Sequence, residues 1–232
     1  MALLGPAAIA MWWDMAPAHR VEFEDWHSHE HFPERLGIPG FLRGSRWADA
    51  AGGPGFFVMY ELAAYETLSS PGYLDRLNNP TPWSRKLMPH HSRMVRSQCR
   101  VLESFGGGIA EALLTLRVSP APGRGDALRA HLRDVLSGIP SRPGMTGAHL
   151  LHTQPPDIPQ TREQQIRGGA DAQADWVVLA SGYDGDALRG LLADALGDNA
   201  LSRAGALPGA IGAVHGLRLS MTAPDLRTGK ED

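Results

Sequence analysis

The chain has 232 residues, and 22 Lys and Arg against 25 Asp and Glu give a formal net charge of −3. Hydrophobic residues make up 43% and charged residues 20%, which is typical of globular domains and argues against disordered, collagen-like and coiled-coil chains. The near-neutral charge argues against a nucleic-acid partner, because a dedicated binder carries a basic face. Cys99 is the only cysteine, which excludes an internal disulfide and a zinc site built from cysteines.

The first charged residue is Asp14, so the chain begins with an uncharged stretch. No Lys or Arg precedes the apolar part of this stretch, as an export signal would require. No segment approaches the roughly 18–20 apolar residues of a membrane helix. We therefore expect a cytoplasmic protein with no membrane partner.

Strand and helix patterns alternate along the first half. Short aliphatic and β-branched runs bounded by Gly or Pro predict strands, and i, i+3, i+4 apolar spacing predicts helices. The predicted elements, in chain order, are a strand at 7–16, a helix at 19–36, strands at 40–48 and 56–63, a helix at 65–77 with a further turn at 83–88, and a strand at 94–102.

The second half repeats this βαββαβ order. Leucines at helical spacing from Leu188 to Leu196 exemplify the pattern. The predicted elements are a strand at 108–118, a helix at 125–136, strands at 144–152 and 175–181, a helix at 186–196 with an extension to 207, and a strand at 211–221.

Two constant offsets indicate a tandem duplication. Pro39 and Pro143 each precede a glycine and lie 104 residues apart, whereas Phe57 and Trp176 lie 119 residues apart. The offset grows by 15 because the second copy carries an insertion at 155–173, which is rich in Pro, Gln and Gly. We expect this insertion to be an exposed loop with at most one helical turn, and a lid is the alternative.

A βαββαβ unit of about 100 residues is the ferredoxin-like plan, with helices on one face of a four-stranded antiparallel sheet. We predict an α+β chain of two such units, residues 1–105 and 106–232, whose sheets cover each other as an α/β barrel. Because one chain already holds both units, a homodimer is left open and is not required.

Candidate site residues cluster on the first predicted helix. In an α-helix, residues three and four apart share a face, and a face with Phe and Trp normally points to the core. The residues of this face are Phe23, Trp26, His27, Glu30, His31 and Glu34.

Three interpretations of this cluster compete. His27-Ser28-His29-Glu30-His31 fits the zinc pattern H-x-x-E-H, which needs a third ligand such as His90, His91 or Glu61. Alternatively, His31 transfers protons with Glu30 or Glu34 assisting and Trp26 as a wall, because histidine titrates near neutral pH. The third interpretation is a solvated polar helix surface.

The segment around Trp26, His31 and Pro33 resembles the first-helix motif of the dimeric α/β-barrel superfamily. It is most similar to the EthD-like group, in which a Trp is followed by a His, then any residue, then Pro. Asn79–Ser84 is also similar to bacterial members of that group. The resemblance implies a small-molecule pocket between sheet and helices, with His31 in it. The superfamily includes cofactor-free monooxygenases, cyclases, decarboxylases, isomerases and haem enzymes, so the resemblance does not select a reaction.

We predict an enzyme that uses His31 and Glu30 for proton transfer on an aromatic or polyketide-like small molecule, without a cofactor. Haem and a divalent metal are not excluded, and a binding protein without chemistry is the rival. An offset of 104 places Val135 at the position of His31, so the site belongs to the first half. The predicted substrate-binding residues are Trp26, His27, Glu34, Tyr60, Trp83 and His90.

Overall fold

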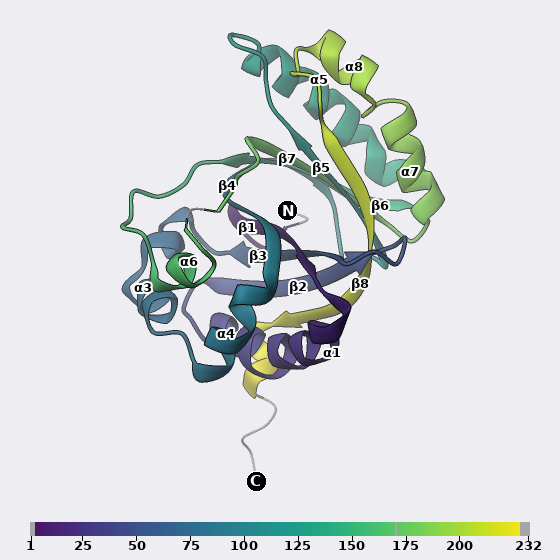
Figure 1. Cartoon of the computed structure of the whole chain (residues 1–232). Coiled ribbons are helices and arrows are strands. Elements are labelled where there is room, and N and C mark those ends of the chain that lie inside the picture. Colours follow the sequence, from purple (N-terminus) through teal and green to yellow (C-terminus); the bar gives the residue numbers. More distant parts are fainter. Residues whose placement is uncertain (1–2, 170, 228–232) are drawn as a thin grey trace.

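The computed structural model describes residues 3–169 and 171–227 (Figure 1). The strands in this part of the chain form one closed antiparallel barrel in the order β1-β3-β2-β8-β5-β7-β6-β4. Their bounds are β1 Ala7–Met15, β2 Phe41–Asp49, β3 Gly55–Leu62, β4 His91–Gly106, β5 Ala112–Val118, β6 Met145–Thr153, β7 Trp176–Gly182 and β8 Ile211–Thr222.

Helices cover the outside of the barrel (Figure 1). The α-helices are α1 Pro17–Trp26, α2 Phe32–Leu36, α3 Pro71–Asn78, α4 Pro82–Leu87, α5 Gly125–Gly138, α6 Arg162–Ile166, α7 Gly185–Ala193 and α8 Asp198–Ala204. A π-helix, η1 His27–His31, joins α1 to α2, and short 3-10 turns are η2 Tyr65–Ser69, η3 Met88–His90, η4 Ile139–Ser141 and η5 Ala223–Arg227.

The predicted fold class is confirmed. Each half contributes four neighbouring strands in ferredoxin-like order, β4-β1-β3-β2 and β8-β5-β7-β6. The halves are joined by antiparallel pairing of β2 with β8 and of β4 with β6. The two sheets therefore also meet edge to edge, which closes the barrel and leaves no free sheet edge.

Alternation along the strands separates three apolar clusters. Ala8, Ala10 and Trp12 of β1 point into the barrel, whereas Ile9 and Trp13 point outward to the helices of the first half. The third cluster lies between β5–β8 and the helices of the second half. A candidate site under the first helix is thus separated from the barrel interior by the sheet.

Strand pairing corrects the duplication offset by one residue. Ile9 pairs with Tyr60 on the helix-facing side of the first sheet, and the matching pair of the second sheet is Leu114 with Ala180. These equivalents are 105 and 120 residues later, whereas the sequence predicts 104 and 119. The error matters because a one-residue slip moves every side chain of a strand to the opposite face.

The first helix contains the extra residue. The starts of β2 and β6 each carry a register shift, and these two starts are 104 residues apart. Between its first and second strands, the first half therefore has one residue more than the second half. The π-helix η1 lies in this interval, and the N–H of Phe32 donates to the carbonyl of His27, five residues back. A single π turn is a one-residue insertion into a helix. Pro33 favours it, because proline cannot donate the hydrogen bond that an α-helix would need there.

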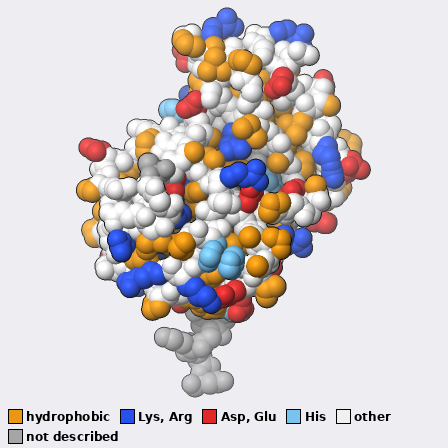
Figure 2. Space-filling view, in the orientation of Figure 1, with side chains coloured by type: hydrophobic (Ala, Val, Ile, Leu, Met, Phe, Trp, Pro, Cys, Tyr) orange, Lys and Arg blue, Asp and Glu red, His pale blue; other side chains and the backbone are white. Residues whose placement is uncertain are grey.

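Among the described residues, no helix is long and apolar enough to cross a membrane. On the face of the molecule drawn in Figure 2, basic and acidic side chains are interspersed.

Candidate active site between the first sheet and its helices

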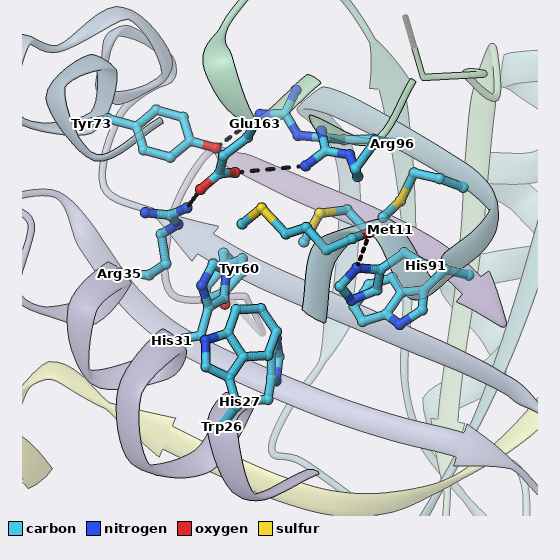
Figure 3. A pocket seen from close by; sticks show the side chains of 14 residues that line it. Met11, Trp26, His27, His31, Arg35, Tyr60, Tyr73, His91, Arg96 and Glu163 are labelled. Carbon is cyan, nitrogen blue, oxygen red and sulfur yellow. Dashed lines mark hydrogen bonds and ion pairs between the residues drawn. The ribbon is translucent and has the colours of Figure 1, made fainter. Parts of the chain in front are cut away.

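A small cavity of about 40 Å³ lies between the outer face of the first sheet and the helices that cover it (Figure 3). It receives side chains from β1, β3, β4, the α1–η1–α2 helix, α3 and α6. The lining residues are Met11, Trp13, Trp26, His27, His31, Arg35, Tyr60, Tyr73, Met88, His91, Met94, Arg96, Glu163 and Arg167.

The π turn places two histidines side by side in the cavity wall. His27 and His31 are 2% and 7% exposed, and their rings stack with centroids 5.2 Å apart. The ring of Trp26 lies 4.5 Å from that of His31, and Phe32 lies 4.3 Å from His27. Aromatic packing thus fixes both imidazoles, with His31 beside Tyr60 and Trp26 in Figure 3.

Both histidines are neutral in the free protein. Burial lowers the pKa of His27 and of His31 well below the usual value of 6.5, and the nearby charges of Arg46 and Arg35, respectively, lower these pKa values further. Burial also lowers the pKa of His91 to about 3, and its Nδ1 donates to the carbonyl of Met88 over 3.0 Å. A neutral imidazole offers one donor and one acceptor nitrogen.

Arginines give the far wall of the cavity its charge. The Arg35 guanidinium, 3% exposed, forms an ion pair with Glu163 and lies 3.4 Å from Glu34. Arg167 lies 3.7 Å from the other Glu163 oxygen. Figure 3 shows Glu163 and Arg35 above His31 and Tyr60.

Arg96 on β4 is buried without a carboxylate of its own. Its guanidinium donates to the Tyr73 hydroxyl over 2.8 Å and to Gln98 Oε1 over 3.1 Å. Within residues 3–169 and 171–227, no carboxylate oxygen lies within 4.0 Å of it. Only neutral groups accept its hydrogen bonds, although the carboxylates of Asp171 and Glu163 lie near enough to interact with its charge.

Several buried polar atoms of the lining have no hydrogen-bond partner in the described chain. They are the Tyr60 hydroxyl, His27 Nδ1, His31 Nδ1 and Trp13 Nε1. Buried polar atoms are almost always satisfied, so four unsatisfied ones around one cavity indicate the position of a polar ligand or water. Burial also raises the pKa of Tyr60 well above 10, which keeps its hydroxyl protonated as a donor.

The structure places four of the predicted site residues on the cavity wall: Trp26, His27, His31 and Tyr60. Tyr60 faces the cavity, whereas the next residue, Glu61, points to the other side of the sheet and pairs with Arg43 over 2.6 Å. Alternation along a strand requires this division. The metal hypothesis named Glu61 as a ligand, and the Arg43 pair accounts for it instead.

Glu34, and not Glu30, is the carboxylate beside His31. Glu34 Oε2 lies 3.8 Å from His31 Nδ1, and burial raises the pKa of Glu34. Glu30 accepts hydrogen bonds from Trp26 Nε1 over 3.1 Å and from the Thr81 hydroxyl, outside the cavity lining. The sequence-based prediction assumed a continuous α-helix, and the extra π residue changes which later side chains face inward.

Trp83 and His90 also lie away from the cavity lining. Trp83 Nε1 donates to Glu22 over 3.2 Å, and the exposed ring of His90 stacks on His19 with centroids 3.7 Å apart. The neighbouring His91 takes the position expected for His90, because β4 begins at His91 and turns its ring toward Trp13 at 5.0 Å.

Sequence reasoning missed the charged half of the cavity: Arg35, Arg96, Glu163 and Arg167. The insertion at 155–173 was expected to be an exposed loop, but its helix α6 packs on the first half. Thr161 and Gln164 form a capping box at its start. This S/T-x-x-E/Q pattern could have predicted the helix, but no local signal shows where the helix docks.

Neither candidate cofactor fits the lining. No group of three His, Cys, Asp or Glu side chains in the described residues is arranged to hold a metal ion. With its wall as the structure has it, the cavity of about 40 Å³ has no room for a haem, and for the same reason none for an aromatic ring.

The second half has no counterpart of this polar lining. With the corrected offset, His27 corresponds to Leu132 of α5. The buried face of α5 consists of Leu128, Leu132 and Leu136, all 0% exposed. The outer side of the second sheet is therefore closed by an apolar helix face.

Solved structures are similar to this chain over nearly its whole length. An anthrone oxidase-like protein superposes with a TM-score of 0.64 and 11% identity, covering 100% of this chain and 99% of its own. The chain shares the fold of this structure, in which the strands close into one antiparallel barrel. Two further solved structures are similar. One, from Fusobacterium nucleatum and assigned as a monooxygenase, has a TM-score of 0.61, 9% identity and coverage of 95% and 96%. The other, assigned as a chlorite dismutase, has a TM-score of 0.53, 12% identity and coverage of 95% and 97%. No protein-family model matches the chain, and no curated protein is detectably similar in sequence.

Proposed function

We propose that this dimeric α/β-barrel chain is an enzyme that moves a proton on a small aromatic or polyketide-like molecule in its first half. The observation that carries the proposal is the unpartnered pair of His31 Nδ1 and the Tyr60 hydroxyl on one cavity wall, next to Trp26. Isomerisation, cyclisation, decarboxylation and oxygenation all begin from, or pass through, such a transfer. The likeness of the first helix to the EthD-like group supports a small-molecule pocket at this place, with His31 in it.

His31 is suited to accept the proton. It is neutral in the free protein, so a nitrogen lone pair is available at neutral pH. When it takes a proton from an acidic C–H or phenol O–H, the substrate becomes an enolate or phenolate. The negative charge of this substrate anion, beside the imidazolium, then raises the pKa of His31 again.

The cavity stabilises the anion formed in this step. The Tyr60 hydroxyl is protonated and free to donate, and Arg35 and Arg96 supply positive charge from the far wall of the cavity. Fixed donors in a buried site stabilise developing charge more strongly than water does. Glu34, 3.8 Å from His31, acts as a positioning residue for the imidazole.

A binding protein without chemistry is the second candidate. The observation that favours it is the strongly lowered pKa of His31, because a group that holds protons weakly is a weak base. In this case the ligand binds to the same lining and leaves unchanged.

A proton-exchange experiment tests both candidates. Anthrone and an anthrone with a ring carboxylate are the first compounds to test, since an anthrone oxidase-like structure is similar. In D2O, NMR follows exchange of their acidic C–H protons with the wild type, His31→Gln and His31→Ala. We expect the wild type to accelerate exchange and both variants to lose at least 100-fold of this acceleration, within the usual range for a general base.

His90→Ala is the matched control, because His90 is an exposed histidine of the same half. It should leave both exchange and melting temperature unchanged. Full exchange activity in His31→Gln would contradict the catalytic role. Binding that is saturable, with unchanged compound and no exchange in the wild type, would instead identify the binding protein.

A further inference from the structure

The insertion of the second half delivers a carboxylate into the cavity of the first half. Glu163 lies on α6, is 5% exposed, and pairs with Arg35, which is 128 positions away in sequence. Its second oxygen lies 3.7 Å from Arg167. The first half has no equivalent segment, since residues 50–54 alone join β2 to β3. The carboxylate thus comes from an element added to the duplicated plan.

The cavity with α6 in place is too small for the proposed substrate. A cavity that accepts benzene measures about 150 Å³, and this one measures about 40 Å³. A ring can enter only if part of the wall moves. Glu163 and Arg167 form the part of the wall that the insertion supplies.

The segment carrying α6 has few buried residues. Between residues 155 and 169, only Thr161 and Glu163 are buried. Pro155, Pro156 and Pro159 precede α6, and Gly168 and Gly169 follow it with φ values of 99° and 126°. Segments with few buried apolar contacts open at low free-energy cost.

Outward movement of α6 would leave two buried guanidiniums facing the cavity. Arg35 would keep only Glu34, at 3.4 Å, and Arg96 has neutral partners. Guanidinium groups bind planar carboxylates through two parallel hydrogen bonds. The group best suited to replace Glu163 is another carboxylate.

We propose that the substrate of this site carries a carboxylate, and that this group displaces Glu163 from Arg35 as α6 moves outward. The proposal rests on the function proposed above for the same cavity and names its substrate class. Glu163 then acts as an internal competitor that keeps Arg35 paired in the free protein and favours ligands whose carboxylate can take its place.

Two compounds of similar size distinguish recognition of negative charge from a simple gain of room in the cavity. Benzoate carries the carboxylate, and benzamide has a similar size and shape without charge. Calorimetry or fluorescence of the cavity tryptophans measures their affinity for the wild type, Glu163→Gln and Glu163→Ala. We expect benzoate affinity to rise about tenfold in Glu163→Gln and at least as much in Glu163→Ala, while benzamide affinity changes less than twofold in Glu163→Gln.

Glu103→Gln is the matched control. Glu103 is also a buried carboxylate, 7% exposed, paired with Arg129 and Arg133, and it lies outside the cavity lining. It should leave both affinities unchanged. An equal rise for both probes in Glu163→Gln, or no rise for benzoate in either variant, would overturn the proposal.

A second measurement does not depend on the variants folding well. Hydrogen exchange of the α6 amides in the wild type should accelerate when benzoate is bound, and unchanged or slower exchange would contradict the displacement. Neither experiment requires turnover. The proton-exchange test of His31 and the benzoate test of carboxylate displacement can therefore fail independently of each other.

Discussion

The imidazole rings of His27 and His31 stack at 24° with centroids 5.2 Å apart, in a π turn that has no counterpart in the second half. The position of α5 equivalent to His27 is Leu132, which packs on the sheet. A polar lining in the first half thus stands where the second half has apolar packing, and we expect a cost in stability that can be measured.

His27→Leu should stabilise the protein by about 1–2 kcal/mol, because it removes a buried nitrogen without a hydrogen-bond partner. Urea unfolding measures the change. The matched variant is Leu132→His at the equivalent position of α5, which should destabilise by about 2–4 kcal/mol because it buries an unsatisfied imidazole. A loss of stability in His27→Leu would show that an unseen partner satisfies the ring.

The two cavity tyrosines should respond in opposite directions to loss of the hydroxyl. The Tyr60 hydroxyl has no partner, so Tyr60→Phe should stabilise the protein by about 1 kcal/mol. The Tyr73 hydroxyl accepts from Arg96 over 2.8 Å, so Tyr73→Phe should destabilise it by about 1.5–3 kcal/mol. Thermal and urea unfolding of the two variants compare them directly, and equal effects would contradict the assignment of the free hydroxyl.

Acid should destabilise the fold through its buried histidines. Burial lowers the pKa of His215 to about 4, whereas the unfolded chain binds the proton near 6.5. The unfolded state therefore holds more protons below pH 6.5, and the stability that the neutral ring contributes is complete above that pH and is lost as pH falls toward 4.

His215→Gln isolates this contribution. Between pH 6 and 4, its unfolding free energy should fall less steeply than that of the wild type, by about 1 kcal/mol per pH unit. Urea unfolding across this range gives both slopes. Parallel slopes would mean that His215 is not protonated differently in the folded and unfolded states.

Glu61 should contribute to the stability of the fold and not to ligand binding in the cavity. It is 1% exposed, accepts from Arg43 over 2.6 and 3.0 Å, and accepts from the Leu4 N–H over 2.7 Å. Glu61→Gln leaves Arg43 without its charge partner and should cost about 3–5 kcal/mol in urea unfolding. Benzoate affinity should not change in this variant, and a loss of affinity with intact stability would place Glu61 in the site.

The duplicated βαββαβ plan and the position of its insertion could be predicted because they depend on local periodicity and on distances along the chain. Trp26, His27 and His31 could be found for the same reason, since the three- and four-residue spacing of a helix face is local. The choice between Glu30 and Glu34 as the carboxylate beside His31 could not be made in this way, because a π turn leaves no mark in composition or hydrophobic pattern.

The sequence by itself therefore determined the two-unit α+β architecture and the half that holds the polar cluster. Only the tertiary structure decided that β2 pairs with β8, that β4 pairs with β6, and that Glu163 reaches Arg35. The reason is physical. Strand and helix formation follow from contacts between near neighbours, whereas a buried ion pair between residues 128 positions apart depends on how the two folded units close around each other.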